Sequence, residues 1–133
     1  MARPLESKNV LLQSAYERLR DARVLARKEN KRYTGAVYLG GYVIECLLKA
    51  AICVEQRTER LPTAYQTHEL DALLEATGYR PTMTPELAAK FRVIIGWNVR
   101  LRYQGQGYQA NDARTFLANV EVIRQWLLEK MSL

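Results

Sequence analysis

The residues best able to do chemistry in this sequence lie together in one apolar segment, residues 36–50. Glu45 and Lys49 are four residues apart, so in a helix they lie on one face, one turn from each other. A carboxylate and an ammonium can hold a substrate or move a proton, but burying them in an apolar helix costs desolvation energy. We therefore expect this pair to have either a buried partner or a function.

Two tyrosines continue the same helical face toward the N-terminus. Tyr38, Tyr42, Glu45 and Lys49 recur at spacings of three and four residues, which places them on one side of a helix. The set has two interpretations. It is either an ion pair flanked by phenols at a helix–helix or subunit interface, or the polar wall of a ligand-binding cleft. In the second case Glu45 is the candidate catalytic base.

A second group of candidate binding residues combines arginines with aromatic rings. Trp97, Arg100, Arg102 and Tyr103 cluster where a helix is expected to end, and Tyr108 follows them. Arginine forks bind phosphates, and aromatic rings provide stacking platforms for bases. The structural alternative is that cations favour a helix C-terminus while the aromatic rings fill the end of a bundle. Both interpretations fit the sequence.

The remaining motifs argue against several classes of site. Residues 105–110 match G-x-G-x-x-A, but the dinucleotide fingerprint needs a strand before the glycines, and a helix is expected there. The single histidine, His68, lies at the expected first turn of a short helix, where we expect capping and packing rather than catalysis. No His, Cys and carboxylate cluster has metal-ligand spacing, so we expect neither a metal nor a cofactor.

Composition and charge describe a small basic domain. The 133 residues, 48% hydrophobic and 26% charged, are typical of one globular domain, which we place at residues 1–133. The formal charge of +6 favours an anionic partner: nucleic acid, a nucleotide, an acidic protein or an anionic membrane surface. The basic run 18–32 is interrupted by acidic residues, so we predict a solvated face rather than a binding groove.

The cysteines and the apolar stretch 36–54 bear on the cell compartment. Cys46 and Cys53 are seven residues apart, about 10 Å along a helix axis, which is too far for a disulfide. We interpret both as core residues in a reducing compartment. The N-terminus has no apolar signal region, and Glu45 and Lys49 would each cost roughly 2.5–3.5 kcal/mol in a bilayer. We therefore expect a cytoplasmic protein whose apolar helix is buried and does not span a membrane.

Helical periodicity runs through the chain, and no segment has the alternation of a strand. We predict an all-α fold, an antiparallel bundle of four longer helices with one short helix between the second and third. The first two helices are expected at residues 4–27 and 34–56, and the third from Pro85 to about residue 102. Gly40 and Gly41 are predicted to mark a close helix crossing, and Gly78 the end of the short helix. The predicted N-terminal caps are Thr34, Thr67, Thr84 and Asn111.

Three segments together resemble HEPN domains. Residues 38–50, Tyr-Leu-Gly-Gly-Tyr-Val-Ile-Glu-Cys-Leu-Leu-Lys-Ala, resemble the second helix of that family. The Thr-His-Glu-Leu turn at 67–70 is similar to its short connecting helix, and the stretch 97–103, with Arg-Leu-Arg-Tyr, is similar to its third-helix end. The resemblance covers residues 33–103, and the first and last helices fit the same bundle.

The resemblance implies a small helical bundle that dimerises, often with its site at the dimer cleft. Many HEPN domains are encoded beside minimal nucleotidyltransferases in toxin–antitoxin or defence systems. The active members are metal-independent endoribonucleases with an arginine followed, after four to six residues, by a histidine on the third long helix. This chain departs from that motif, because no histidine follows His68. Arg92, Arg100 and Arg102 therefore lack their histidine.

Two functional hypotheses follow, with a third that assigns no ligand. We favour a non-catalytic, dimeric HEPN-like module that binds a nucleotide, an RNA or a nucleotidyltransferase partner. The alternative is a metal-independent endoribonuclease toxin that uses Glu45 or a tyrosine instead of histidine. The third is an oligomerising scaffold. The candidate ligand-binding residues are Tyr38, Tyr42, Glu45, Lys49, Trp97, Arg100, Arg102 and Tyr103.

Overall fold

A computed structural model gives the fold and describes residues 7–104 and 107–133. Over these residues there is no strand, and the nearest feature is an isolated bridge between Ser7 and Arg60. The predicted all-α bundle, four longer helices and a short one, is confirmed. The helices are α1 (Lys8–Leu25), α2 (Tyr33–Glu55), α3 (Leu70–Thr77), α4 (Pro85–Gln104) and α5 (Ala110–Lys130), with short 3-10 turns η2 (Thr63–Tyr65) and η3 (Arg80–Thr82).

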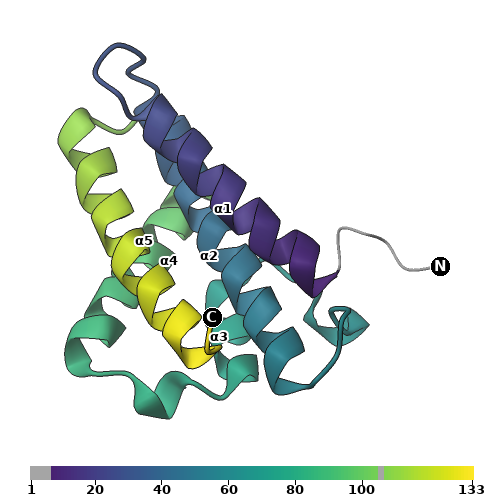
Figure 1. The fold of residues 1–133 in the computed structure, drawn as a ribbon. Helices are drawn as coiled ribbons and strands as arrows, with labels where there is room; N and C mark the ends of the chain where they lie inside the picture. The colour runs from purple at the N-terminus through teal and green to yellow at the C-terminus, as the bar shows by residue number, and fades with distance from the viewer. Residues whose placement is uncertain (1–6, 105–106) are drawn as a thin grey trace.

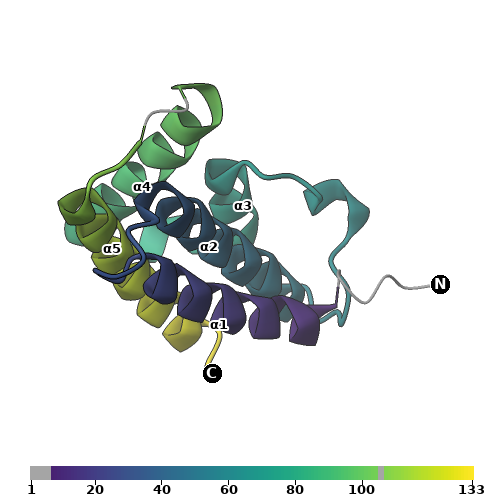
Figure 2. The same cartoon turned by 90° about the horizontal axis from the view of Figure 1, so that it is seen from above.

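Helix α2 is the centre of the bundle. It contacts α1, α3, α4 and α5, and the two views show α1 along one side of it and α3 and α4 on the other (Figures 1 and 2). By length and mean hydropathy, 1.7 over 18 residues, α2 would qualify as a membrane span, yet 72% of that window is buried in the bundle. Its place in the core accounts for its apolar composition.

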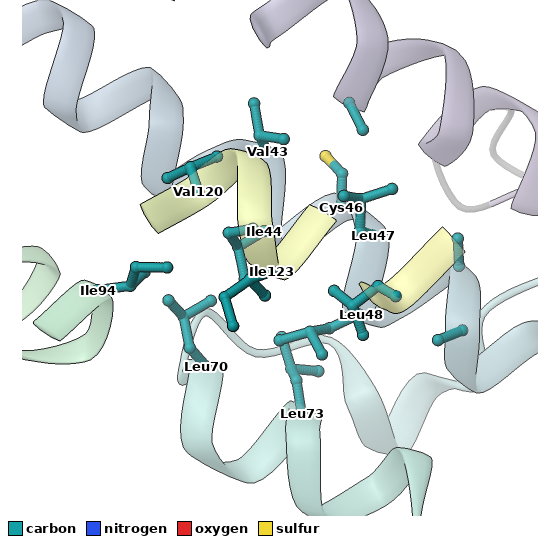
Figure 3. Close-up of a cluster of buried hydrophobic side chains, with 14 of the residues drawn as sticks. Val43, Ile44, Cys46, Leu47, Leu48, Leu70, Leu73, Ile94, Val120 and Ile123 are labelled. Carbon is teal, nitrogen blue, oxygen red and sulfur yellow. The ribbon is translucent and has the colours of Figure 1, made fainter. Parts of the chain in front are cut away.

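The core forms where the apolar faces of four helices meet α2. Ile44 and Leu48 of α2 lie among Leu73 of α3, Ile94 of α4 and Ile123 of α5 (Figure 3). All five side chains are fully buried. The two cysteines are free thiols buried in the same core, as predicted.

Gly40 and Gly41 allow two helices to approach α2 closely, as predicted from their position. A Cβ atom at Gly40 would lie 2.9 Å from the Phe116 ring of α5, and one at Gly41 would lie 3.0 Å from the Asn98 Oδ1 atom of α4. The second contact matters for function, because it sets how near Asn98 stands to the polar face of α2.

Two of the predicted caps are wrong at the starts of α2 and α3. Thr34 lies inside the first turn of α2, and its hydroxyl accepts the Tyr108 backbone N–H at 3.1 Å instead. Thr67 accepts the Glu69 N–H at 3.2 Å in the loop, and α3 begins only at Leu70.

The other helix ends divide between confirmed and wrong predictions. Thr84 caps α4, accepting the Leu87 N–H at 3.2 Å, and Gly78 ends α3 with φ of 76°, both as predicted. Asn111 is not the cap of α5, because the cap is Gln109, two residues earlier, which forms a capping box with Asp112. The predicted start of the first helix, at residue 4, lies outside the described residues. Within the described part of the chain, α1 begins at Lys8.

Candidate functional site

An open cleft lies between α2, α4 and the loop before α3. Its volume is about 320 Å³, and Figure 2 shows α3 and α4 on the same side of α2. Tyr38 and Tyr42 are 61% and 39% exposed, so the face of α2 singled out in the sequence is open in the single chain. The lining residues are Tyr38, Tyr42, Glu45, His68, Asn98 and Leu101.

Glu45 is the hub of the polar groups in this cleft. Its Oε2 atom accepts a hydrogen bond from Lys49 Nζ at 2.9 Å and lies 2.9 Å from His68 Nδ1. The Glu45 and Lys49 side chains are only 9% and 13% exposed. Each charge therefore has the buried partner that the sequence led us to expect, and this pairing offsets the cost of removing both from water.

His68 does not play the capping and packing role expected for it. It lies before the first residue of α3, Leu70, and its side chain is 71% exposed. With Nδ1 held by Glu45, Nε2 is the nitrogen open to solvent. Sequence reasoning missed this contact because 23 residues separate the two side chains and only the path of the intervening loop joins them.

Tyr42, another titratable group in the cleft, is unsuited to proton transfer near neutral pH. The negative charge of the neighbouring Cys46 side chain when it is ionised, together with burial, raises the pKa of Tyr42 to about 12. Burial likewise raises the pKa of Cys46 to about 11. A phenol with so high a pKa is a poor general base near neutral pH, so this shift argues against Tyr42 in the role of a tyrosine base.

The arginine and aromatic group is only partly brought together. The Trp97 ring stacks with Tyr108 and with Phe116, with both centroid distances 5.3 Å and interplanar angles of 18° and 15°. This packing agrees with the structural alternative, in which the aromatic rings fill the end of the bundle, and Trp97 is not among the described residues that line the cleft. Arg100 is exposed but does not line the cleft.

Further sequence predictions fall at the end of α4. The side chains of Arg102 and Tyr103 lie outside the described residues, as do residues 105 and 106 of the glycine-rich motif. The element before that motif is α4 and not a strand, so the dinucleotide fingerprint lacks the context it requires. Over the described part of the chain, no group of three or more His, Cys, Asp or Glu side chains is placed to hold a metal ion.

Comparison with known proteins identifies the family. The family model described as HEPN domain matches residues 9–131, nearly the whole chain. No curated protein and no solved structure matches the sequence. The match extends the resemblance of residues 33–103 to the first and last helices of the bundle. The chain therefore belongs to the HEPN domain family.

Proposed function

We propose that this HEPN domain is a non-catalytic binding module whose cleft takes a nucleobase, presented by a free nucleotide or by RNA. The observation that carries the proposal is the open face of α2, where two exposed tyrosine rings stand beside a compact polar set. Aromatic faces stack on bases without regard to sequence. Glu45, His68 and Asn98 supply the hydrogen-bond acceptors and donors that a base edge requires.

The size of the cleft fits this class of ligand. Its volume of about 320 Å³ lies at the small end of ligand sites, which span roughly 300–1,000 Å³. A base with its ribose is a ligand of that scale, whereas a dinucleotide cofactor would extend well beyond the lining residues.

Proton chemistry favours binding over cleavage in the single chain. Cleavage of RNA requires one group to take the 2′-hydroxyl proton and another to protonate the leaving oxygen. Tyr42 holds its proton to about pH 12, and Glu45 already contacts both Lys49 and His68. Of Glu45 and His68, His68 is the more exposed, with 71% of its side chain open against 9% for Glu45.

Membership of the family supports the wider setting of the proposal. We propose a homodimer in the cytoplasm, with a nucleotidyltransferase partner and a role in a toxin–antitoxin or defence system. These are properties that the family resemblance implies, and each stays a prediction for this chain.

Titration of ribonucleoside monophosphates and a short single-stranded RNA into the protein tests the proposal. Tyr38→Ala removes a stacking surface worth about 1–3 kcal/mol per base, so we expect affinity to fall by about 5- to 150-fold. Tyr16→Ala is the matched control, because Tyr16 is an exposed tyrosine of α1 outside the cleft. Equal affinities of the two variants, or no binding of any ligand at millimolar concentration, would refute the proposal.

A second candidate function, a metal-independent endoribonuclease, rests on the contact between Glu45 and His68. A carboxylate bound to Nδ1 holds an imidazole in one orientation and leaves Nε2 to act as base, as in hydrolase triads. His68 would then replace the histidine that α4 lacks.

Cleavage of RNA in EDTA tests this second candidate. If His68 is the base, His68→Ala lowers the rate about 10²- to 10⁴-fold, and Glu45→Gln lowers it through loss of the orienting carboxylate. The Tyr16→Ala variant again serves as control. RNA that stays intact with the unmodified protein excludes the nuclease and leaves the binding proposal standing.

A further inference from the structure

A second cavity lies where the end of α1, the hinge after it and the starts of α2 and α5 meet. Its volume is about 620 Å³, and it shares no lining residue with the cleft. Tyr33 and Leu117 contribute an aromatic and an apolar wall. The cationic lining residues are Arg23, Arg27, Lys28, Lys31 and Arg114, and no acidic residue is among the described residues that line the cavity.

Most of these cations lack a compensating carboxylate. Arg23 pairs with Glu121 at 2.6 Å, but Arg27, Lys28 and Lys31 form no ion pair with any residue that the structure describes. Cations gathered around a concave surface repel one another and raise the local potential, and a bound anion relieves both effects.

The basic run predicted as a solvated face divides in two. Near its start, Arg18 pairs with Asp21 at 3.0 Å, as expected for a face interrupted by acidic residues. At its end, Arg27, Lys28 and Lys31 are exposed as predicted, yet they also line a cavity. Glu29 interrupts this end of the run as well, but it is not among the described residues that line the cavity.

The hinge holds its cations in place through its backbone. The Lys31 N–H donates to the Arg27 carbonyl at 3.0 Å and the Arg32 N–H to the Leu25 carbonyl at 2.9 Å. Lys31 has φ of 53°, a left-handed conformation that glycine or asparagine adopts far more readily. The backbone at Lys31 is therefore fixed before any ligand arrives, which lowers the part of the entropic cost of binding that would come from ordering the hinge.

We propose that this cavity binds adjacent phosphate groups, carried by a nucleoside di- or triphosphate or by an RNA backbone. Arginine forks and lysine ammonium groups are the side chains that bind phosphate. The Tyr33 ring and Leu117 give the attached base or ribose a surface to contact. The N-terminus of α5, at Ala110 in the cavity wall, adds the positive end of its helix dipole.

Three probes separate the two sources of phosphate: inorganic triphosphate, ATP and a fluorescently labelled single-stranded RNA. We expect Lys28→Ala combined with Lys31→Ala to lower the affinity for the probe that binds at least tenfold, since charge-assisted hydrogen bonds are lost. For RNA, the slope of log affinity against log salt should also fall by about 1.4, at about 0.7 per lost cation. Tight binding of ATP with weak binding of RNA assigns a nucleotide site, and tight binding of RNA with weak binding of ATP assigns an RNA backbone site.

The matched control removes two cations elsewhere. Arg20 and Arg92 are exposed and line neither the cleft nor the basic cavity, so Arg20→Ala with Arg92→Ala should leave affinity within about twofold. Equal losses in the two double variants, or no binding of any of the three probes, would overturn the proposal. Tyr38→Ala should not change triphosphate binding, so failure here is distinguishable from failure at the cleft.

Discussion

The ion pair buried in α2 permits a test of whether it serves stability or function. Glu45→Ala leaves the Lys49 ammonium, 13% exposed, without its carboxylate and removes the partner of His68. Breaking a fully buried pair from one side costs about 3–5 kcal/mol. Because Lys49 keeps some access to water and has a flexible stem, we expect Glu45→Ala to lower the free energy of unfolding by about 2–3 kcal/mol.

Replacing both charges has a different expected outcome. Glu45→Leu combined with Lys49→Met fills the same volume with apolar atoms, and such exchanges of buried pairs are often neutral or stabilising by about 1–4 kcal/mol. The double variant also loses the contact with the exposed His68, and contacts of that kind contribute less than about 1 kcal/mol. We expect its stability to lie within about 1 kcal/mol of the unmodified protein.

Urea unfolding followed by circular dichroism measures both effects. With a slope of about 2 kcal/mol per molar urea, the single variant should unfold at a midpoint about 1–1.5 M lower, while the midpoint of the double variant should shift by less than about 0.5 M. A double variant at least as unstable as Glu45→Ala would show that the pair is needed for the fold. A stable double variant that no longer binds the nucleotide would assign the pair to function.

Three further predictions concern the core. Gly40→Ala gains about 1 kcal/mol of helix propensity, but its Cβ would meet the fully buried Phe116 ring at 2.9 Å, and overpacking costs about 1–3 kcal/mol. The Cβ atom added in Gly96→Ala would meet nothing within 4 Å. In chemical unfolding, the free energy of unfolding of Gly96→Ala should therefore exceed that of Gly40→Ala by about 2 kcal/mol, and the reverse order would contradict the close helix crossing at Gly40. Cys46 and Cys53 should stay unreactive toward a disulfide reagent at pH 8 until the protein is denatured, and prompt labelling of the native protein would contradict their burial. Because burial raises the pKa of Cys46 from 9.0 to about 11, the unfolded thiol ionises first, so stability should fall as pH rises between those values, and less so in Cys46→Ala.

Features that depend on neighbouring residues were predictable from the sequence. The apolar stripes of α2 and α5, the Thr84 cap and the Gly78 end all follow from local periodicity and local hydrogen bonding. The pairing of Glu45 with Lys49 is equally local, since one helical turn joins them. These interactions need no knowledge of the path of the chain.

The missed features join residues that are distant in sequence. Thr34 does not cap α2, because its hydroxyl oxygen accepts a hydrogen bond from the Tyr108 backbone N–H. Trp97 packs against the Phe116 ring of α5 and is not among the described residues that line the cleft. His68 enters the cleft only because the loop before α3 carries it back to α2. In each case packing between elements decided what the local pattern left open.

The span-like composition of α2 has a consequence for how the protein is made. A helix of this hydropathy, alone in water at the ribosome exit, would expose an apolar surface as long as a membrane span, interrupted by Glu45 and Lys49. Helix α1 precedes it in the chain and packs along it. Helix α1, which covers one side of that surface, is therefore already synthesised when α2 emerges. The two helices are neighbours in sequence, so their hairpin forms through short-range contacts, which form fastest. We expect this order of the helices along the chain to shorten the time for which the apolar surface of α2 is exposed during synthesis. A circular permutant with α1 moved behind α5 should expose that surface for longer.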